Sequence, residues 1–295
     1  MNSNWGRGRF GLVSGSRGTL LVSVAIGWFF ALGLRFVLQG ILPTIAASFP
    51  AATQTQAGIA VTVLWATYGI VQFPAGIAAD RIGEGRVLIG SLLASAVSVL
   101  VFSLTPTFTL FVIAMGVFGA ATGFYSPPRG TLLTRVFSGQ ADRALGLTLA
   151  AGSFGAAVLP ALAAVFVDGL GWRTTLGLAA PGFLLAALFV YRSSRGLETR
   201  DDDSDQTETE PKPESEQLSL LTTIKSAARA VCCRRTSLAV LAAIVMYFGF
   251  QGFTALATTY LVAEKGFTQS SAGILYGGLF VVGALSQWFS GVLAQ

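Results

Sequence analysis

The chain has 295 residues, of which 53% are hydrophobic and 11% are charged, and its formal net charge is +5. A mean hydropathy of +0.67 excludes an ordinary soluble domain and predicts an all-α protein that crosses a membrane several times. The sequence has no histidine, and its two cysteines, Cys232 and Cys233, are neighbours. We therefore expect no disulfide framework, no metal site and no cofactor.

Eight apolar runs follow a basic tail, and each is near the length of about 20 residues that crosses a bilayer. The first run is too long for a signal-peptide core, which has about 7–15 apolar residues, so we interpret it as a retained helix. An acidic segment that cannot fold by itself separates the sixth run from the seventh. We predict an N-terminal six-helix bundle at 1–192, a cytoplasmic linker at 193–236 and a partial C-terminal bundle at 237–295. The runs are 19–46, 57–79, 87–104, 110–125, 145–167, 174–191, 238–263 and 272–294.

The positions of lysine and arginine indicate the orientation. With a cytoplasmic N-terminus, the basic tail, the turn at 80–86, the segment that contains Arg129 and the linker all lie inside, and only Arg173 and Lys265 lie in outside loops. We therefore predict a multi-pass protein of the cell membrane with its N-terminus in the cytoplasm.

A short, charged turn joins the second and third runs. It reads Gly76-x-x-x-Asp80-Arg81-x-Gly83-x-x-Arg86, and its glycines suit close helix contacts and positive φ angles. This pattern resembles the signature that members of the major facilitator superfamily carry between their second and third helices. The resemblance implies that Gly76, Asp80, Arg81, Gly83 and Arg86 form a gating motif that acts on conformation.

An internal repeat supports the resemblance. Residues 57–79 and 272–294 align without gaps, and the alignment pairs Gln72 with Gln287, as two homologous halves require. The family is built from twelve helices in two halves of six, so this chain would hold one complete half and the first two helices of the other. We therefore expect a fragment or a truncated product that cannot move solute by itself.

Arg35 is the ionisable residue deepest within a predicted span, where a charge costs about 2.5–3.5 kcal/mol on insertion scales. Two interpretations stand: a cationic contact for an anion in a water-filled cavity, with Gln39 on the same helix face, or a side chain that snorkels to the outer interface. The resemblance favours the first, because family members that carry phosphorylated solutes, the glycerol-3-phosphate transporter among them, place an arginine in the first helix. Those carriers add a second arginine in the seventh helix, where this chain offers Gln251 and other uncharged residues, which argues against a dianionic phosphate ester.

Trp65, Tyr68 and Gln72 share one face of the second predicted helix, where they either line a path or pack against a neighbour. The predicted substrate-binding residues are Arg35, Gln39, Tyr68, Gln72, Gln251 and Gln287.

These features predict a secondary active transporter that moves a small organic anion or a polar metabolite by alternating access. Multidrug efflux is the alternative among transporters, although no acidic residue lies within a predicted span to bind a cation. The alternative from another class is a non-transporting membrane receptor or assembly subunit. We do not expect an enzyme, because the zinc motif and the intramembrane pair of acids are missing. The expected partners are a small-molecule substrate and the lipid bilayer, with a coupling proton or sodium ion left open and no nucleic acid.

Overall fold

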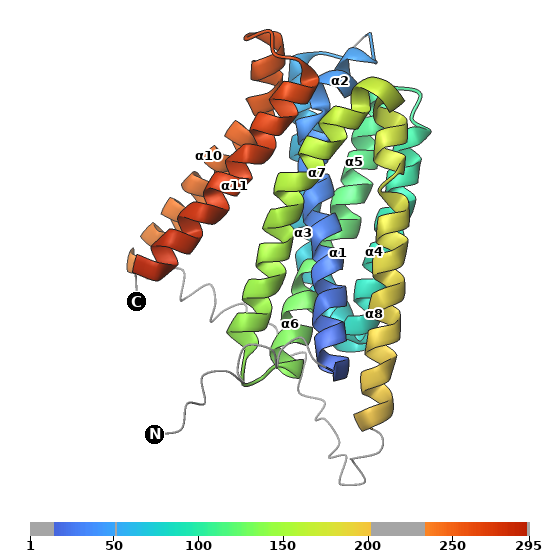
Figure 1. The fold of residues 1–295 in the computed structure, drawn as a ribbon, viewed down its shortest axis with the longest axis vertical. Helices are drawn as coiled ribbons and strands as arrows, with labels where there is room; N and C mark the ends of the chain where they lie inside the picture. The colour runs from blue at the N-terminus through green and yellow to red at the C-terminus, as the bar shows by residue number, and fades with distance from the viewer. Residues whose placement is uncertain (1–14, 51, 202–233, 294–295) are drawn as a thin grey trace. The chain divides into compact units, whose positions relative to one another are not determined.

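The structure is a computed structural model that describes residues 15–50, 52–201 and 234–293. Within these ranges every regular element is a helix, which confirms the predicted fold class (Figure 1). The helices are α1 (Gly15–Gly40), α2 (Leu42–Ala47), α3 (Gln54–Ile82), α4 (Glu84–Ser103), α5 (Phe108–Gly123), α6 (Ser126–Val136), α7 (Ala141–Gly177), α8 (Ala180–Asp201), α10 (Arg234–Ala263) and α11 (Gln269–Leu293).

Six segments of the described chain are long and apolar enough to cross a membrane. One of them, Ala141–Ser194, has 54 residues, which is enough for two crossings, and α11 adds 25 residues that overlap the eighth predicted run. The long segment is divided at Gly171, whose φ of 73° only glycine adopts readily. All eight predicted spans therefore have a helical counterpart.

Two differences between the predicted runs and the observed helices involve proline. The first run, 19–46, is not one helix: α1 ends at Gly40 and α2 begins at Leu42, because Pro43 has no N–H to bond to the carbonyl four residues earlier. The fourth run was expected to end at Tyr125; α5 ends two residues earlier, at Gly123, and after a turn the chain forms a further helix, α6, from Ser126 to Val136. Prolines stand at the first helical positions of α6, where the missing N–H groups would have no intrahelical partner.

The described chain forms two compact units. One unit contains residues up to Thr199 together with the segment from Ala255 onward, and the other covers Arg200–Thr254. The predicted linker falls mostly outside the described residues, and the predicted division into three regions stays a prediction.

Helix α1 runs through the middle of the first unit and packs along α7 (Figure 1). Close approach at glycines makes this packing possible, because a Cβ atom at Gly33 would lie 2.8 Å from the carbonyl oxygen of Gly155. Helices α3 and α5 approach in the same way, since a Cβ atom at Gly119 would collide with the backbone of Leu64. In lipid no hydrophobic effect drives helices together. Small residues at helix crossings let the backbones approach, and the resulting van der Waals contacts stabilise the packing.

Candidate anion site

Arg35 lies on the interior face of α1 and is fully buried. Its Cζ atom lies 4.0 Å from the ring centre of Tyr68, 5.1 Å from that of Trp65 and 5.3 Å from that of Trp28. The Nε atom donates to the carbonyl oxygen of Ala31 at 3.0 Å, but Nη1 and Nη2 have no hydrogen-bond partner within the described residues. The side chain therefore points among aromatic rings inside the bundle and does not snorkel to an interface.

Arg129 is a second buried arginine beside the same aromatic cluster. It lies in the first turn of α6, is 8% exposed, and has its Cζ atom 4.3 Å from the ring centre of Trp28. Its Nη1 atom donates to Thr148 Oγ1 of α7 at 2.7 Å, and its Nε atom has no partner in the described part of the chain. The ring of Trp28 therefore lies close to both guanidinium groups.

Arg129 was not among the predicted substrate-binding residues, because the segment that contains it was predicted to lie in the cytoplasm. The position of the two prolines before Arg129 contained a usable signal, since proline is common at the first helical position. Leu132 and Leu133 follow Arg129 at the i+3 and i+4 spacing of a buried helix face, and both are buried. A helix that starts at Ser126 would have placed Arg129 on that same face.

The unpartnered polar atoms of the site share one property. Within the described residues, the buried side-chain nitrogen and oxygen atoms without a hydrogen-bond partner are all N–H donors, and no acceptor is among them. A ligand that satisfies them must present several acceptor atoms, and the two guanidinium groups favour one that is negatively charged. The donors are Trp28 Nε1, Arg35 Nη1 and Nη2, Gln39 Nε2, Trp65 Nε1 and Arg129 Nε.

No acidic side chain of the described residues neutralises the charge of the site. The ion pair found among the described residues joins Arg135 to Glu84 and leaves both Arg35 and Arg129 without an acidic partner. Each intramembrane arginine costs about 2.5–3.5 kcal/mol on insertion scales, and a desolvated cation–π contact returns about 2 kcal/mol. An anion between the arginines would remove most of the remaining cost.

Tyrosine hydroxyls hold the surrounding helices in register. Tyr68 of α3 shares a 3.0 Å hydrogen bond with Ser126 Oγ at the start of α6, and Tyr125 donates to the carbonyl oxygen of Val24 in α1 at 2.9 Å. A side chain at Gly27 would collide with the Tyr125 ring, so glycine is required there. These contacts link α1, α3 and α6 around the two arginines.

The other predicted substrate-binding residues differ in burial and in the part of the structure to which they belong. Gln39 is fully buried one turn from Arg35, whereas Gln72 is partly buried and makes no side-chain hydrogen bond with the described residues. Gln251 belongs to the second unit, where its Nε2 atom donates to the hydroxyl of Tyr247 at 3.4 Å. The side chain of Gln287 lies outside the described part of the structure.

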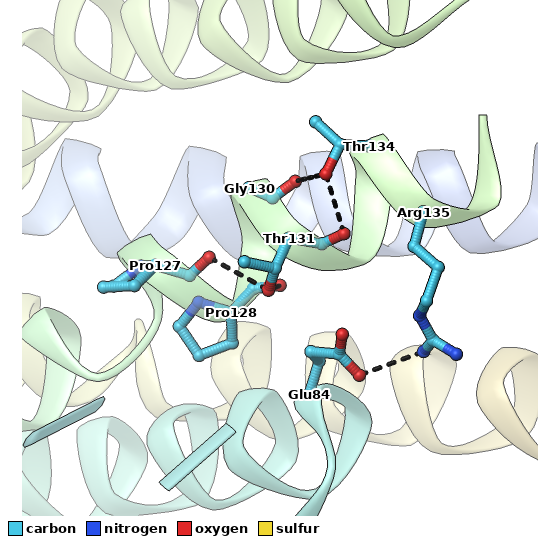
Figure 2. Close-up of polar contacts among 7 residues, drawn as sticks. All are labelled: Glu84, Pro127, Pro128, Gly130, Thr131, Thr134 and Arg135. Atoms are coloured by element: carbon cyan, nitrogen blue, oxygen red, sulfur yellow. Dashed lines mark hydrogen bonds and ion pairs between the residues drawn. The ribbon is translucent and has the colours of Figure 1, made fainter. Parts of the chain in front are cut away.

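Among the described residues, the charged turn between α3 and α4 makes one ion pair, and its partners are not those of the predicted gating motif. Glu84 at the start of α4 accepts a 2.9 Å hydrogen bond from Arg135 of α6 (Figure 2). The side chains of Asp80, Arg81 and Arg86 are exposed. The positive φ expected in the turn occurs at Gly83, at 89°.

The close helix contact expected at Gly76 is not present. A Cβ atom built at this position would have open space around it within 4 Å. The gating role of the five motif residues stays a prediction.

Curated relatives match slightly more than half of the chain. A probable hexose phosphate transport protein of Chlamydia trachomatis is 29% identical over 167 residues, which are 56% of this chain and 36% of that protein. The membrane sensor protein UhpC of Salmonella typhimurium is 28% identical over 168 residues, 56% of this chain and 37% of the sensor. The aligned region thus spans little more than a third of the length of these relatives.

A solved structure shares the fold at low sequence identity. A bacterial homologue of the human lysosomal transporter Spinster, in an inward-facing and unoccupied conformation, superposes with a TM-score of 0.74 at 18% identity. The superposition covers 95% of this chain and 63% of that protein. At this identity the likeness concerns the fold alone.

The family model described as Major Facilitator Superfamily matches residues 24–295. This range includes the turn motif and both arginines of the site. Together with the long apolar helices, it makes the chain a multi-pass membrane protein, and it supports the prediction of a transporter rather than an enzyme. The chain belongs to the major facilitator superfamily.

Proposed function

We propose that this protein is a secondary transporter that binds a phosphorylated metabolite, with a hexose phosphate as the best candidate, between Arg35 and Arg129. The observation that carries the proposal is the set of unpartnered buried atoms, which are all N–H donors and include three guanidinium nitrogens. A phosphate monoester supplies three acceptor oxygens and a charge near −2 at neutral pH, which matches two arginines.

The sequence argument against a dianionic phosphate ester is weakened by Arg129. That argument assumed that the second cation of the site has to come from the seventh helix. Arg129 of α6, which lies between the fourth and fifth predicted spans, supplies a buried guanidinium from the predicted N-terminal bundle. The similarity to a probable hexose phosphate transport protein supports the same substrate class.

A sensor that binds the same kind of ligand without moving it is the second candidate. The similarity to the membrane sensor protein UhpC favours this candidate, because the sensor is 28% identical to this chain over a region of nearly the same length as the transport protein, which is 29% identical. Binding and uptake separate the two in a protein that has both halves of the fold: a carrier accumulates labelled ligand in the cells that express it, and a sensor binds ligand without accumulation. Multidrug efflux has less support, since two buried guanidinium groups repel cationic drugs.

Alternating access, a cytoplasmic N-terminus and a location in the cell membrane belong to this proposal. The orientation rests on the distribution of basic residues, and the mechanism on the relation between two homologous halves. A coupling proton or sodium ion stays a prediction.

A ligand panel tests the substrate class. We expect glucose 6-phosphate to raise the melting temperature of the purified chain in detergent, because a ligand at 100 times its dissociation constant stabilises by about 2.7 kcal/mol. Glucose has the same ring without the phosphate and serves as the matched control, with no expected shift. Equal shifts with glucose and glucose 6-phosphate would contradict an anion site.

The turn motif predicts a conformational effect. Replacing Asp80 with asparagine should shift the balance between inward-open and outward-open conformations much more than it lowers the affinity for glucose 6-phosphate, since a gate acts on conformational change. Asp142→Asn, which neutralises an exposed acid at the start of α7, is the control and should leave that balance unchanged. Loss of binding in Asp80→Asn with an unchanged conformational balance would contradict the gating role.

A further inference from the structure

The break between α1 and α2 leaves two backbone carbonyls without their usual helical partners. Proline at position 43 has no N–H, so it cannot donate to the carbonyl oxygen of Gln39 four residues earlier. The next carbonyl, that of Gly40, belongs to the last residue of α1. Both residues are fully buried or nearly so, and buried carbonyls require a partner.

Side chains from the segment beyond Ala255 supply these partners. Thr258 of α10 donates to the carbonyl oxygen of Gln39 at 3.0 Å, and Gln269 of α11 donates through Nε2 to the carbonyl oxygen of Gly40 at 2.8 Å. The other end of the Gln269 amide accepts from Thr44 Oγ1 at 3.0 Å. Residues more than 200 positions away in the sequence therefore form the hydrogen bonds that the backbone lacks at the break between α1 and α2.

The side chain of Gln39 is held in the same way. Tyr276 of α11 is fully buried and donates its hydroxyl to Gln39 Oε1 at 3.2 Å. This bond directs the amide so that Nε2 is left as a buried donor without a partner in the described chain. Gln39 is four residues from Arg35, so the free N–H lies on the helix face that carries the guanidinium group.

Tyr276 reaches Gln39 because α11 packs tightly on α7. A Cβ atom at Gly277 would lie 3.2 Å from Ala161 Cβ and would collide with the carbonyl oxygen of Ala157. Phe280, one turn further along α11, packs against Phe36 of α1 with ring centres 4.5 Å apart. The rings of Phe280 and Tyr276 are also in contact, with ring centres 5.4 Å apart, so the packing of α11 fixes the Tyr276 ring next to the Gln39 amide.

We propose that Thr258 and Tyr276 are positioning residues that hold Gln39 for contact with the ligand. Thr258 fixes the backbone of Gln39 where Pro43 has removed the helical bond, and Tyr276 fixes the amide so that its N–H faces the anion site. Helices α10 and α11 thus determine the affinity of a site whose charged residues come from α1 and α6. This inference rests on the proposed function, because it concerns the same ligand.

Substitutions that remove single hydroxyl groups test the proposal. We expect Tyr276→Phe and Thr258→Val each to weaken glucose 6-phosphate binding by about five- to tenfold, the size of one hydrogen bond. Tyr260→Phe is the matched control, because Tyr260 is an exposed tyrosine of α10 and the change should leave binding as in the wild type. Unchanged binding in both test variants would overturn the proposal.

Two double variants separate positioning from a general loss of packing. In a Gln39→Ala background, Tyr276→Phe should have no further effect on affinity, since the amide that it orients is gone. Pro43→Ala should restore binding in the Thr258→Val protein, because alanine supplies the N–H that the Gln39 carbonyl lacks. Additive losses in the first pair, or no recovery in the second, would overturn the proposal. A wild-type chain that does not bind glucose 6-phosphate would instead contradict the proposed function.

Discussion

Arg35→Met and Arg129→Met are each expected to lower the affinity for glucose 6-phosphate by about 100-fold, which corresponds to two charge-assisted hydrogen bonds of about 1.5 kcal/mol each. Methionine keeps much of the side-chain length and fills irregular apolar space, so the change removes charge and donors rather than packing. Isothermal titration of the purified chain measures the effect.

The same variants should not lose stability in the absence of ligand. Arg35 and Arg129 are buried cations without an acidic partner, so their removal relieves a desolvation cost. We expect a melting temperature equal to or above that of the wild type, together with the loss of binding. A parallel loss of stability would indicate that the arginines serve the fold and not the ligand.

The chain offers a matched control in the same helix. Arg135 lies in α6 with Arg129, but its side chain is 64% exposed and is paired with Glu84. Arg135→Met should leave affinity within about twofold, because surface ion pairs contribute little. Lysine at position 35 or 129 should give an intermediate loss, since it keeps the charge but not the planar pair of donors. Binding by Arg35→Lys equal to the wild type would favour a purely electrostatic role.

Gly155→Val is expected to disrupt the bundle. A Cβ atom at Gly155 would collide with the carbonyl oxygen of Phe29 and lie 3.0 Å from its carbonyl carbon. Backbone atoms of α1 cannot rotate out of the way, so α1 and α7 must separate, at a cost near or above the 3 kcal/mol upper end of typical overpacking. The movement would also displace Arg35, six residues after Phe29, and weaken ligand binding.

Gly146→Val is the control for Gly155→Val. It makes the same substitution in the same helix, but a Cβ atom at Gly146 meets nothing within 4 Å. The unfavourable helix propensity of valine lowers the stability of both variants equally. The difference between their melting temperatures therefore reports the collision with α1. We expect a clearly lower melting temperature and poor monodispersity for Gly155→Val alone. Equal melting temperatures would contradict the close contact between α1 and α7.

Helix existence could be predicted from the sequence because it depends on a local quantity. A segment of about 20 apolar residues must satisfy its backbone hydrogen bonds internally in lipid, so hydropathy alone indicates where helices lie. The turn at Gly83 was predictable for a similar reason, since glycine in a charged break suits a positive φ. Arg35 stood out because a charge within an apolar run is costly.

Arg129 could not be assigned from the sequence with the same rules. The two prolines before it are compatible with a break or with the start of a new helix, and the structure shows that a new helix, α6, begins at Ser126 and places the arginine on an interior face. The basic residues of that segment also supported the prediction of a cytoplasmic location, and Arg135, unlike Arg129, has an exposed side chain. Identical residue types six positions apart thus have opposite environments.

By itself, the sequence determined the class of protein, the approximate spans and one of the two arginines. Only the tertiary structure decided that Arg129 and Arg35 lie by the same Trp28 ring, and that Tyr276 bonds to Gln39 across 237 positions. The physical reason is that bilayer insertion acts on each segment separately, whereas a site depends on the depth and rotation of several helices at once. Those quantities are set by contacts such as Gly33 with Gly155, where the absence of a side chain decides how closely two backbones approach.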